Sequence, residues 1–162
     1  MTDLDDRLAA LEARVQELAD TLDVMRVIAS YAPSVDGGAP DVAGLIWTED
    51  SRYESDNADE PLIGRAPIVE LAERIGGLPM GVAHFFNLPL VTLDGDRAVV
   101  TAESNTYHQD GDRYVVARVS SNRWELDRVD GTWLIRNRVN RLLDGSPGAR
   151  DLLARGARES LS

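Results

Sequence analysis

Asp36 and His84 are the side chains in this sequence that are best suited to act together in acid–base chemistry. Asp36 comes at the expected end of a long helix, directly before two glycines. A carboxylate there faces the negative end of the helix dipole, so it needs a proton or a partner. We expect His84 to be the partner, because a carboxylate on one ring nitrogen holds an imidazole in one tautomer and makes it more basic. The alternative is an ordinary glycine-capped helix end with Asp36 in solvent.

Tyr31 can join this pair if the helix is interrupted. An unbroken helix turns about 100° per residue, which would leave Tyr31 and Asp36 about 140° apart. Pro33 lies between the two residues. Proline has no N–H and clashes with the preceding turn, so we expect the helix to kink or stop there and to turn both side chains toward one cavity.

These three residue types suit the removal of water next to a carbonyl group. That reaction needs a base for the α proton, a donor for the enolate oxygen and an acid for the departing hydroxide. One imidazole can act as both base and acid, with a tyrosine as the donor, so no cofactor is required. Asp36, His84 and His108 could instead form a metal site of two histidines and one carboxylate. Their spacing gives little support to that alternative, and we expect no metal.

Composition excludes several other classes of function. The 162 residues suit one domain with one core. The net charge is −11 and all 17 basic residues are arginine, so there is no basic stripe for nucleic acid. The absence of cysteine excludes disulfides, thiolate metal sites and cysteine nucleophiles. Residues 3–7 include three aspartates and no apolar run could span a membrane, so we expect a cytoplasmic protein with neither a signal peptide nor a membrane partner.

The N-terminal helix, expected over residues 1–32, carries one apolar stripe. Its apolar residues alternate in steps of four and three, as on one face of a packed helix. A sheet or a neighbouring subunit could cover such a face, so we expect a homo-oligomer, either a trimer or a dimer. The residues of the stripe are Leu4, Leu8, Leu11, Val15, Leu18, Leu22 and Met25.

Shorter elements follow this helix. Pro40 suits the first turn of a second helix that runs through Trp47, and a third helix is expected over residues 64–75, closed by two glycines. Four strands are expected after it, divided by Asp-Gly turns. Their ranges are 81–93, 98–109, 113–129 and 132–143.

This order of elements predicts an α+β domain over residues 1–145, in which a curved antiparallel sheet wraps against the N-terminal helices and forms a cone-shaped pocket. Residues 146–162 form a tail with one or two helical turns and no assigned function. Alternation along the strands places a few polar side chains among apolar ones on one face, which is typical of a small-molecule pocket. Those strand residues are His84, His108, Ser120, Asn122 and Arg141.

Over about residues 5–145 the sequence resembles the SnoaL-like branch of the nuclear transport factor 2-like superfamily, which has a cystatin-like fold. The resemblance rests on the Tyr-x-x-x-x-Asp-Gly helix end, the Leu-Ile-Gly-Arg run at 62–65, the position of His84 and the closing run at 128–133. The bacterial bile acid 7α-dehydratases and scytalone dehydratase are the members with the most similar residue pattern.

The resemblance to these dehydratases implies roles for individual residues. The catalytic tyrosine, aspartate and histidine of the bile acid enzyme correspond to Tyr31, Asp36 and His84. In scytalone dehydratase the aspartate and two histidines correspond to Asp36, His84 and His108, and one tyrosine corresponds to Tyr53. Its other tyrosine falls at Val35, which is a departure. Its serine and asparagine correspond to Ser120 and Asn122.

We therefore expect a lyase that dehydrates a hydroxylated, apolar, polycyclic, steroid-like or polyketide-like carbonyl compound without a cofactor. Tyr31, Asp36 and His84 would be catalytic. The superfamily also contains cyclases, epoxide hydrolases, non-catalytic binding or assembly subunits, and isomerases that use a carboxylate alone as the base. These classes remain alternatives. The expected substrate-binding residues are Tyr53, His108, Ser120, Asn122 and Arg141.

Overall fold

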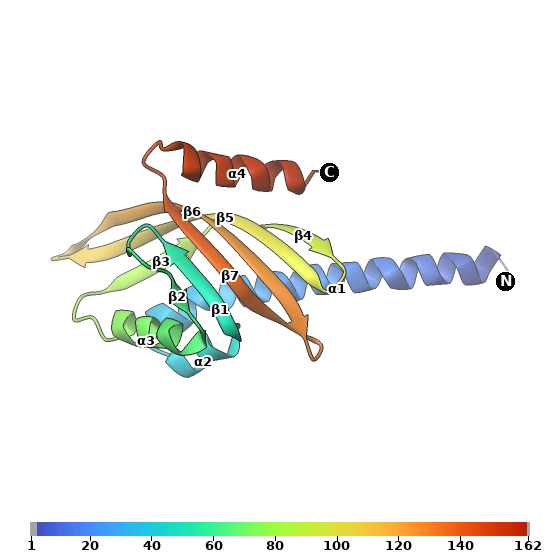
Figure 1. Ribbon diagram of the computed structural model, residues 1–162, viewed down its shortest axis with the longest axis horizontal. Helices are drawn as coiled ribbons and strands as arrows, with labels where there is room; N and C mark the ends of the chain where they lie inside the picture. The colour runs from blue at the N-terminus through green and yellow to red at the C-terminus, as the bar shows by residue number, and fades with distance from the viewer. Residues whose placement is uncertain (1–2, 162) are drawn as a thin grey trace.

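Helices fill the first part of the chain and strands most of the rest, in a computed structural model that describes residues 3–161 (Figure 1). This order confirms the α+β class, and no helix within residues 3–161 is long and apolar enough to cross a membrane. The elements are α1 (Asp3–Asp36), α2 (Pro40–Leu45), β1 (Trp47–Ser55), β2 (Leu62–Ile63), α3 (Arg65–Gly76), β3 (Val82–Phe86), β4 (Leu90–Asp94), β5 (Arg97–Asp110), β6 (Arg113–Val129), β7 (Thr132–Leu142) and α4 (Pro147–Glu159).

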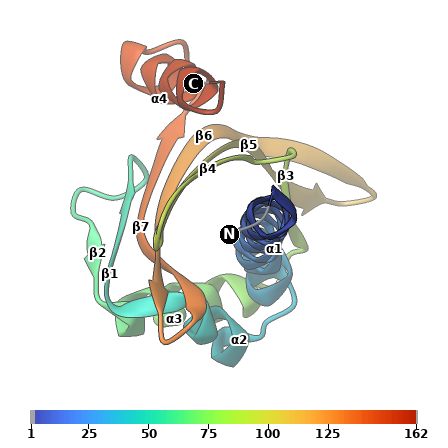
Figure 2. The same ribbon diagram turned by 90° about the vertical axis from the view of Figure 1, so that its right-hand side faces the viewer.

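One curved sheet wraps around the C-terminal part of α1, as the view along that helix shows (Figure 2). The strand order is β2-β1-β7-β6-β5-β3, and β4 also pairs with β5. All pairs are antiparallel except β1 with β7, a parallel pair that the sequence did not predict. A hairpin forces neighbouring strands to be antiparallel, but residues 56–131 separate β1 from β7, so no turn fixes their direction.

Helix α1 does not stop at Pro33, where a kink or a stop was expected. The helix continues through Pro33 to Asp36. Backbone hydrogen bonds then close it, among them one from the N–H of Gly37 to the Pro33 carbonyl at 2.9 Å. Ile28 and Val35, on either side of the proline, are almost fully buried. Burial of this apolar face therefore holds the helix together although Pro33 removes one backbone hydrogen bond.

The strand boundaries also depart from the expected ranges at two points. β1 begins at Trp47, which was expected to be helical and is fully buried. The long strand expected over residues 81–93 is divided into β3 and β4, because Pro89 has no N–H for the ladder. The Asp-Gly turns are confirmed, and their glycines have φ angles of 59°, 60° and 80° at Gly95, Gly111 and Gly131.

The core lies between the C-terminal part of α1 and the concave face of the sheet. Val24 and Ile28 of α1 pack with Trp47, Trp124 and Ile135 of the strands. The N-terminal part of α1 extends past the sheet (Figure 1). Most of the apolar stripe is therefore uncovered within one chain. Its exposed members are Leu4, Leu8, Leu11, Val15, Leu18 and Leu22, each with 54 to 71% of its surface accessible.

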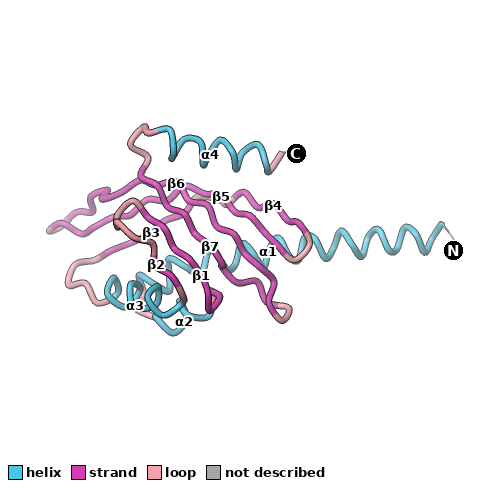
Figure 3. Tube along the Cα trace, viewed as in Figure 1, coloured by secondary structure: helices cyan, strands magenta, loops and turns pink. Residues whose placement is uncertain are grey.

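The tail contains a complete helix, α4, rather than the one or two turns expected. Figure 3 shows α4 on the opposite side of the sheet from α1. It packs on β5 and β6. The Arg123 guanidinium holds it by an ion pair with Glu159 at 2.7 Å. Helix α4 thus covers part of the outer face of the sheet, and the concave face lies beside α1, α3 and the loop after β1.

Candidate active site

Asp36 and His84 are in direct contact, as the sequence predicts. The Asp36 Oδ1 atom lies 2.5 Å from Nδ1 of His84, and the backbone N–H of His84 donates to Oδ2 at 2.6 Å. Both side chains are largely buried, with 20% and 16% of their surface exposed. One carboxylate therefore fixes both the ring and the backbone of His84. The contact favours the tautomer with its proton on Nδ1 and leaves Nε2 as the basic nitrogen.

A cavity of about 250 Å³ lies beside this pair, and the His84 ring forms part of its wall. Helices α1 and α3 contribute to the wall, together with β1, β2, β3, β5, β6, β7 and the loop after β1. This volume is near the lower end of the range for small-molecule sites. The lining residues are Tyr31, Tyr53, Ser55, Asn57, Ala58, Glu60, Leu62, Leu71, Arg74, Ile75, His84, Ser104, Thr106, Arg118, Ser120, Arg138 and Asn140.

Strand register explains which polar side chains accompany His84. In the β3–β5 pair, His84 lies opposite Thr106 and Phe86 lies opposite Ser104. In the β5–β6 pair, Ser104 lies opposite Ser120. Directly opposite residues share a face of the sheet, so hydroxyl groups from two strands line the cavity next to the imidazole.

The sequence-predicted site residues fall into two groups. Tyr31, Tyr53, His84 and Ser120 line the cavity, and Asp36 lies behind His84. The structure does not bring the other three into the wall. His108 lies opposite Val82, the first residue of β3. Asn122 is fully buried and contacts Arg138. Arg141 forms an ion pair with Glu54.

Asp36, His84 and His108 also do not converge. Among residues 3–161, no group of three histidine, aspartate or glutamate side chains is arranged so that it could hold a metal ion. The metal site considered from the sequence is therefore not formed by these residues.

Arg138 is a pocket residue that the sequence reasoning missed. Only 4% of its surface is exposed, and its guanidinium lies over several aromatic rings. The distances to the ring centroids are 4.4 Å for Tyr31, 4.7 Å for Tyr53, 5.3 Å for Trp124 and 5.8 Å for Phe86. Such cation–π contacts stabilise a buried cation without neutralising it.

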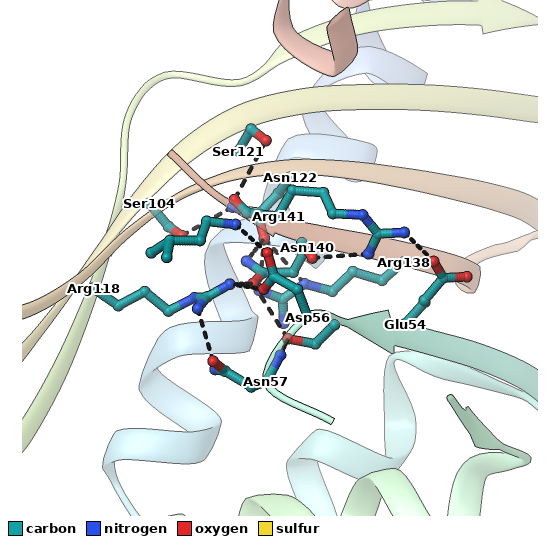
Figure 4. Close-up of polar contacts among 12 residues, drawn as sticks. Glu54, Asp56, Asn57, Ser104, Arg118, Ser121, Asn122, Arg138, Asn140 and Arg141 are labelled. Carbon is teal, nitrogen blue, oxygen red and sulfur yellow. Dashed lines mark hydrogen bonds and ion pairs between the residues drawn. The ribbon is translucent and has the colours of Figure 1, made fainter. Parts of the chain in front are cut away.

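A polar network holds the Arg138 side chain in place (Figure 4). Its Nε and Nη2 atoms donate to Oδ1 of Asn122 at 3.3 and 2.8 Å. The same oxygen accepts from Nδ2 of Asn140 at 2.8 Å, and Nδ2 of Asn122 donates to Oγ of Ser104 at 2.9 Å. Oδ1 of Asn140 accepts from Nη2 of Arg118 at 3.0 Å. The amide groups thus link the two arginines of the wall.

Tyr31 is the cavity tyrosine nearest the Arg138 charge. Burial raises the pKa of its phenol, and the positive charge of Arg138 opposes that rise without reversing it. Tyr31 is therefore a neutral phenol at physiological pH and can donate a hydrogen bond. The site combines a carboxylate-held base, a phenol donor and a buried cation around one small cavity.

Comparisons with known proteins agree with this architecture. A model of the SnoaL-like domain matches residues 16–139. A nuclear transport factor 2-like protein with a cystatin-like fold from Novosphingobium aromaticivorans is 34% identical, with a TM-score of 0.85 over 90% of this chain and 96% of the other. A comparison with curated proteins gives no match.

More distant solved structures share the fold. A protein of unknown function from Mycobacterium tuberculosis is 21% identical, with a TM-score of 0.73 over 90% of this chain and 89% of the other. A candidate scytalone dehydratase from N. aromaticivorans is 18% identical, with a TM-score of 0.69 over 78% of this chain and 85% of the other. The chain therefore belongs to the SnoaL-like domain family of the nuclear transport factor 2-like superfamily, with its cystatin-like fold.

Proposed function

We propose that this protein is a cofactor-independent hydro-lyase that removes water from a compact β-hydroxy carbonyl compound. The observation that carries the proposal is the contact of Asp36 with His84 in the wall of a partly enclosed cavity. A carboxylate on Nδ1 leaves Nε2 available as a base and stabilises the imidazolium that forms after proton transfer.

The reaction needs one imidazole and one hydrogen-bond donor. Nε2 of His84 takes the proton from the carbon next to the carbonyl, and the electron pair of that C–H bond moves into the enolate. The enolate then expels the β-hydroxyl group as the carbon–oxygen bond breaks. The imidazolium returns its proton to the departing hydroxide, which leaves as water. Tyr31, a buried neutral phenol in the cavity wall, donates to the carbonyl oxygen as negative charge develops there.

The size of the cavity narrows the substrate class. About 250 Å³ favours a compound of one or two fused rings over a complete steroid skeleton. Leu62, Leu71 and Ile75 supply apolar surface for such rings. The hydroxyl groups of Ser104 and Ser120 lie on the sheet side of the same cavity, where they suit the polar substituents of a polyketide-like aromatic ketone.

The geometry is less favourable to an isomerase that uses Asp36 alone as its base. Both carboxylate oxygens are engaged, one by the His84 ring and the other by the His84 backbone. A non-catalytic assembly subunit, which needs no open pocket, is also less consistent with a cavity lined by a histidine–aspartate pair. These features support the histidine as the proton carrier.

The test is turnover of a panel of compact aryl β-hydroxy ketones, followed by the ultraviolet absorbance of the enone product. We expect His84→Ala to lower the rate by about 10²- to 10⁴-fold, the usual contribution of a positioned acid–base group. Binding of the enone product, measured by fluorescence or calorimetry, should change little. His108→Ala is the matched comparison, because His108 is outside the cavity wall, and it should retain turnover. Unchanged turnover in His84→Ala would contradict the proposal.

A further inference from the structure

Arg138 stands out because it is a buried cation with no carboxylate partner among residues 3–161. An arginine side chain stays protonated at all physiological pH values, so its burial requires compensation. The other largely buried arginines have that compensation. Arg118 pairs with Asp56, Arg123 with Glu159 and Arg128 with Asp20. Within residues 3–161, Arg138 instead contacts aromatic rings and the neutral amide of Asn122.

This charge is directed to the cavity. Arg138 belongs to the cavity wall, and its Nη1 atom is buried without a well-aligned hydrogen bond to any group in residues 3–161. Burial opposes the charge, but the Tyr31 hydroxyl also interacts with the guanidinium and raises the pKa of Arg138. Each of the other two nitrogens donates one hydrogen bond to Asn122. Buried N–H groups in native proteins are almost always paired, so a cationic donor without a partner beside a binding cavity is suited to a ligand oxygen.

The aromatic and amide neighbours explain how the cation persists in an empty site. The ring centroids of Tyr31 and Tyr53 lie 4.4 and 4.7 Å from the guanidinium carbon of Arg138. The faces of these rings carry partial negative charge and attract the cation. A carboxylate in the place of either ring would neutralise the positive charge of Arg138. In a protein with 28 acidic residues, this arrangement leaves a full positive charge at the cavity wall.

We infer that Arg138 forms an oxyanion site that holds one negatively charged oxygen atom of the ligand, as an enolate or a phenolate. Nε and Nη2 each donate to one amide oxygen, so the side-on fork of the guanidinium is taken, and Nη1 is the nitrogen left without a partner for a ligand oxygen. The inference rests on the proposed function for the identity of the enolate. In that reaction the carbonyl is neutral at first and becomes anionic, and a preorganised cation stabilises that change.

The test uses 4-nitrophenol, a compact probe whose phenol and phenolate forms differ in visible absorbance. We expect wild-type protein to bind the phenolate at least about tenfold more tightly than the phenol, which lowers the pKa of the bound probe by about one unit. The neutral ether 4-nitroanisole is the control ligand. Arg138→Gln should abolish the phenolate preference and leave binding of 4-nitroanisole within about twofold of wild type.

Two further variants keep this test decisive. Asn122→Asp places a carboxylate beside Arg138 without removing it, and the Arg138 and Asn140 donors can all still bond to oxygen. Ser104, which now accepts a hydrogen bond from Asn122, can turn its hydroxyl to donate. This variant should also lose the phenolate preference. Arg136→Gln, on the same strand but paired with Glu125 and Asp127 outside the cavity, should keep it.

The outcomes separate this inference from the proposed reaction. A phenolate preference that persists in Arg138→Gln or Asn122→Asp, or that wild-type protein lacks, would overturn the oxyanion site. Loss of the preference in both variants, with unchanged circular dichroism, supports it even if no β-hydroxy ketone is turned over. Turnover that depends on His84 together with no phenolate preference would support the dehydratase and reject the role of Arg138.

Discussion

Replacement of Asp36 by asparagine changes the chemistry of His84 with little change in shape. In the wild type, the backbone N–H of His84 donates to one carboxylate oxygen at 2.6 Å and the ring Nδ1 contacts the other at 2.5 Å. The backbone group can only donate, so the single amide oxygen of the introduced asparagine must face it. The amide NH₂ then faces Nδ1, which has to accept, and the ring proton moves to Nε2.

The size of the effect follows from this exchange of tautomers. A histidine with its proton on Nε2 cannot take a proton there, and the imidazolium also loses its carboxylate. The loss should approach that of the whole acid–base group, about 10²- to 10⁴-fold in kcat, with a small effect on product binding. The assay is the enone absorbance for turnover, with ¹⁵N NMR of the imidazole as a direct report of the tautomer. Wild-type turnover in Asp36→Asn, or an unchanged tautomer, would refute this reasoning.

Two other predictions concern stability and association. The hydrogen bond from Arg128 holds the pKa of Asp20 below its usual value of 3.8, so the contact stabilises the fold above that pH and is lost as the pH falls through the lowered pKa. The wild type and Asp20→Asn should therefore differ less in their free energy of unfolding, measured in urea, below about pH 4 than above it. A difference that stays constant with pH would contradict this prediction. We also expect the exposed stripe of α1 to be covered by another copy of the chain. The double variant Leu11→Glu/Leu18→Glu should have a lower molecular mass in sedimentation than the wild type. A wild type that is monomeric would rule out this association.

Much of the architecture and the central pair could be predicted from the sequence. The Asp-Gly turns mark the hairpins, and the poor position of a carboxylate at a helix end indicates that Asp36 needs a partner. Pro33 was a misleading signal. It has the chemistry of a helix stop, yet burial of Ile28 and Val35 on the same helix outweighs the lost hydrogen bond.

Arg138 shows why part of the site could not be predicted. Strict alternation along the last strand places Trp133, Ile135 and Arg141 on one face. In the structure Ile135 pairs with Leu126 and the next pair is Asn137 with Glu125, so Arg136 is an extra residue. This bulge shifts the alternation by one, and Arg138 turns inward while Arg141 turns toward Glu54. A bulge depends on the partner strand, so a single-strand pattern does not indicate it.

His108 departs from prediction for a different reason. Its alternation is right, since it follows Ser104 and Thr106 along one strand and lies opposite Val82. It is nevertheless outside the cavity, whose wall includes Ser104 and Thr106 of the same strand together with residues of α3 and the loop after β1. The face of a residue can be read from the sequence, whereas the depth of a pocket depends on elements elsewhere in the chain.

The central claim is that His84, held by Asp36, is the base of this cavity. The most direct measurement is exchange of the α protons of 1-tetralone, a compact aryl ketone without a leaving group, in D₂O by NMR. The wild type should incorporate deuterium, and His84→Ala should slow incorporation by about 10²-fold or more. Exchange that persists in His84→Ala and disappears in Asp36→Asn would show that the carboxylate is the base and would contradict this account.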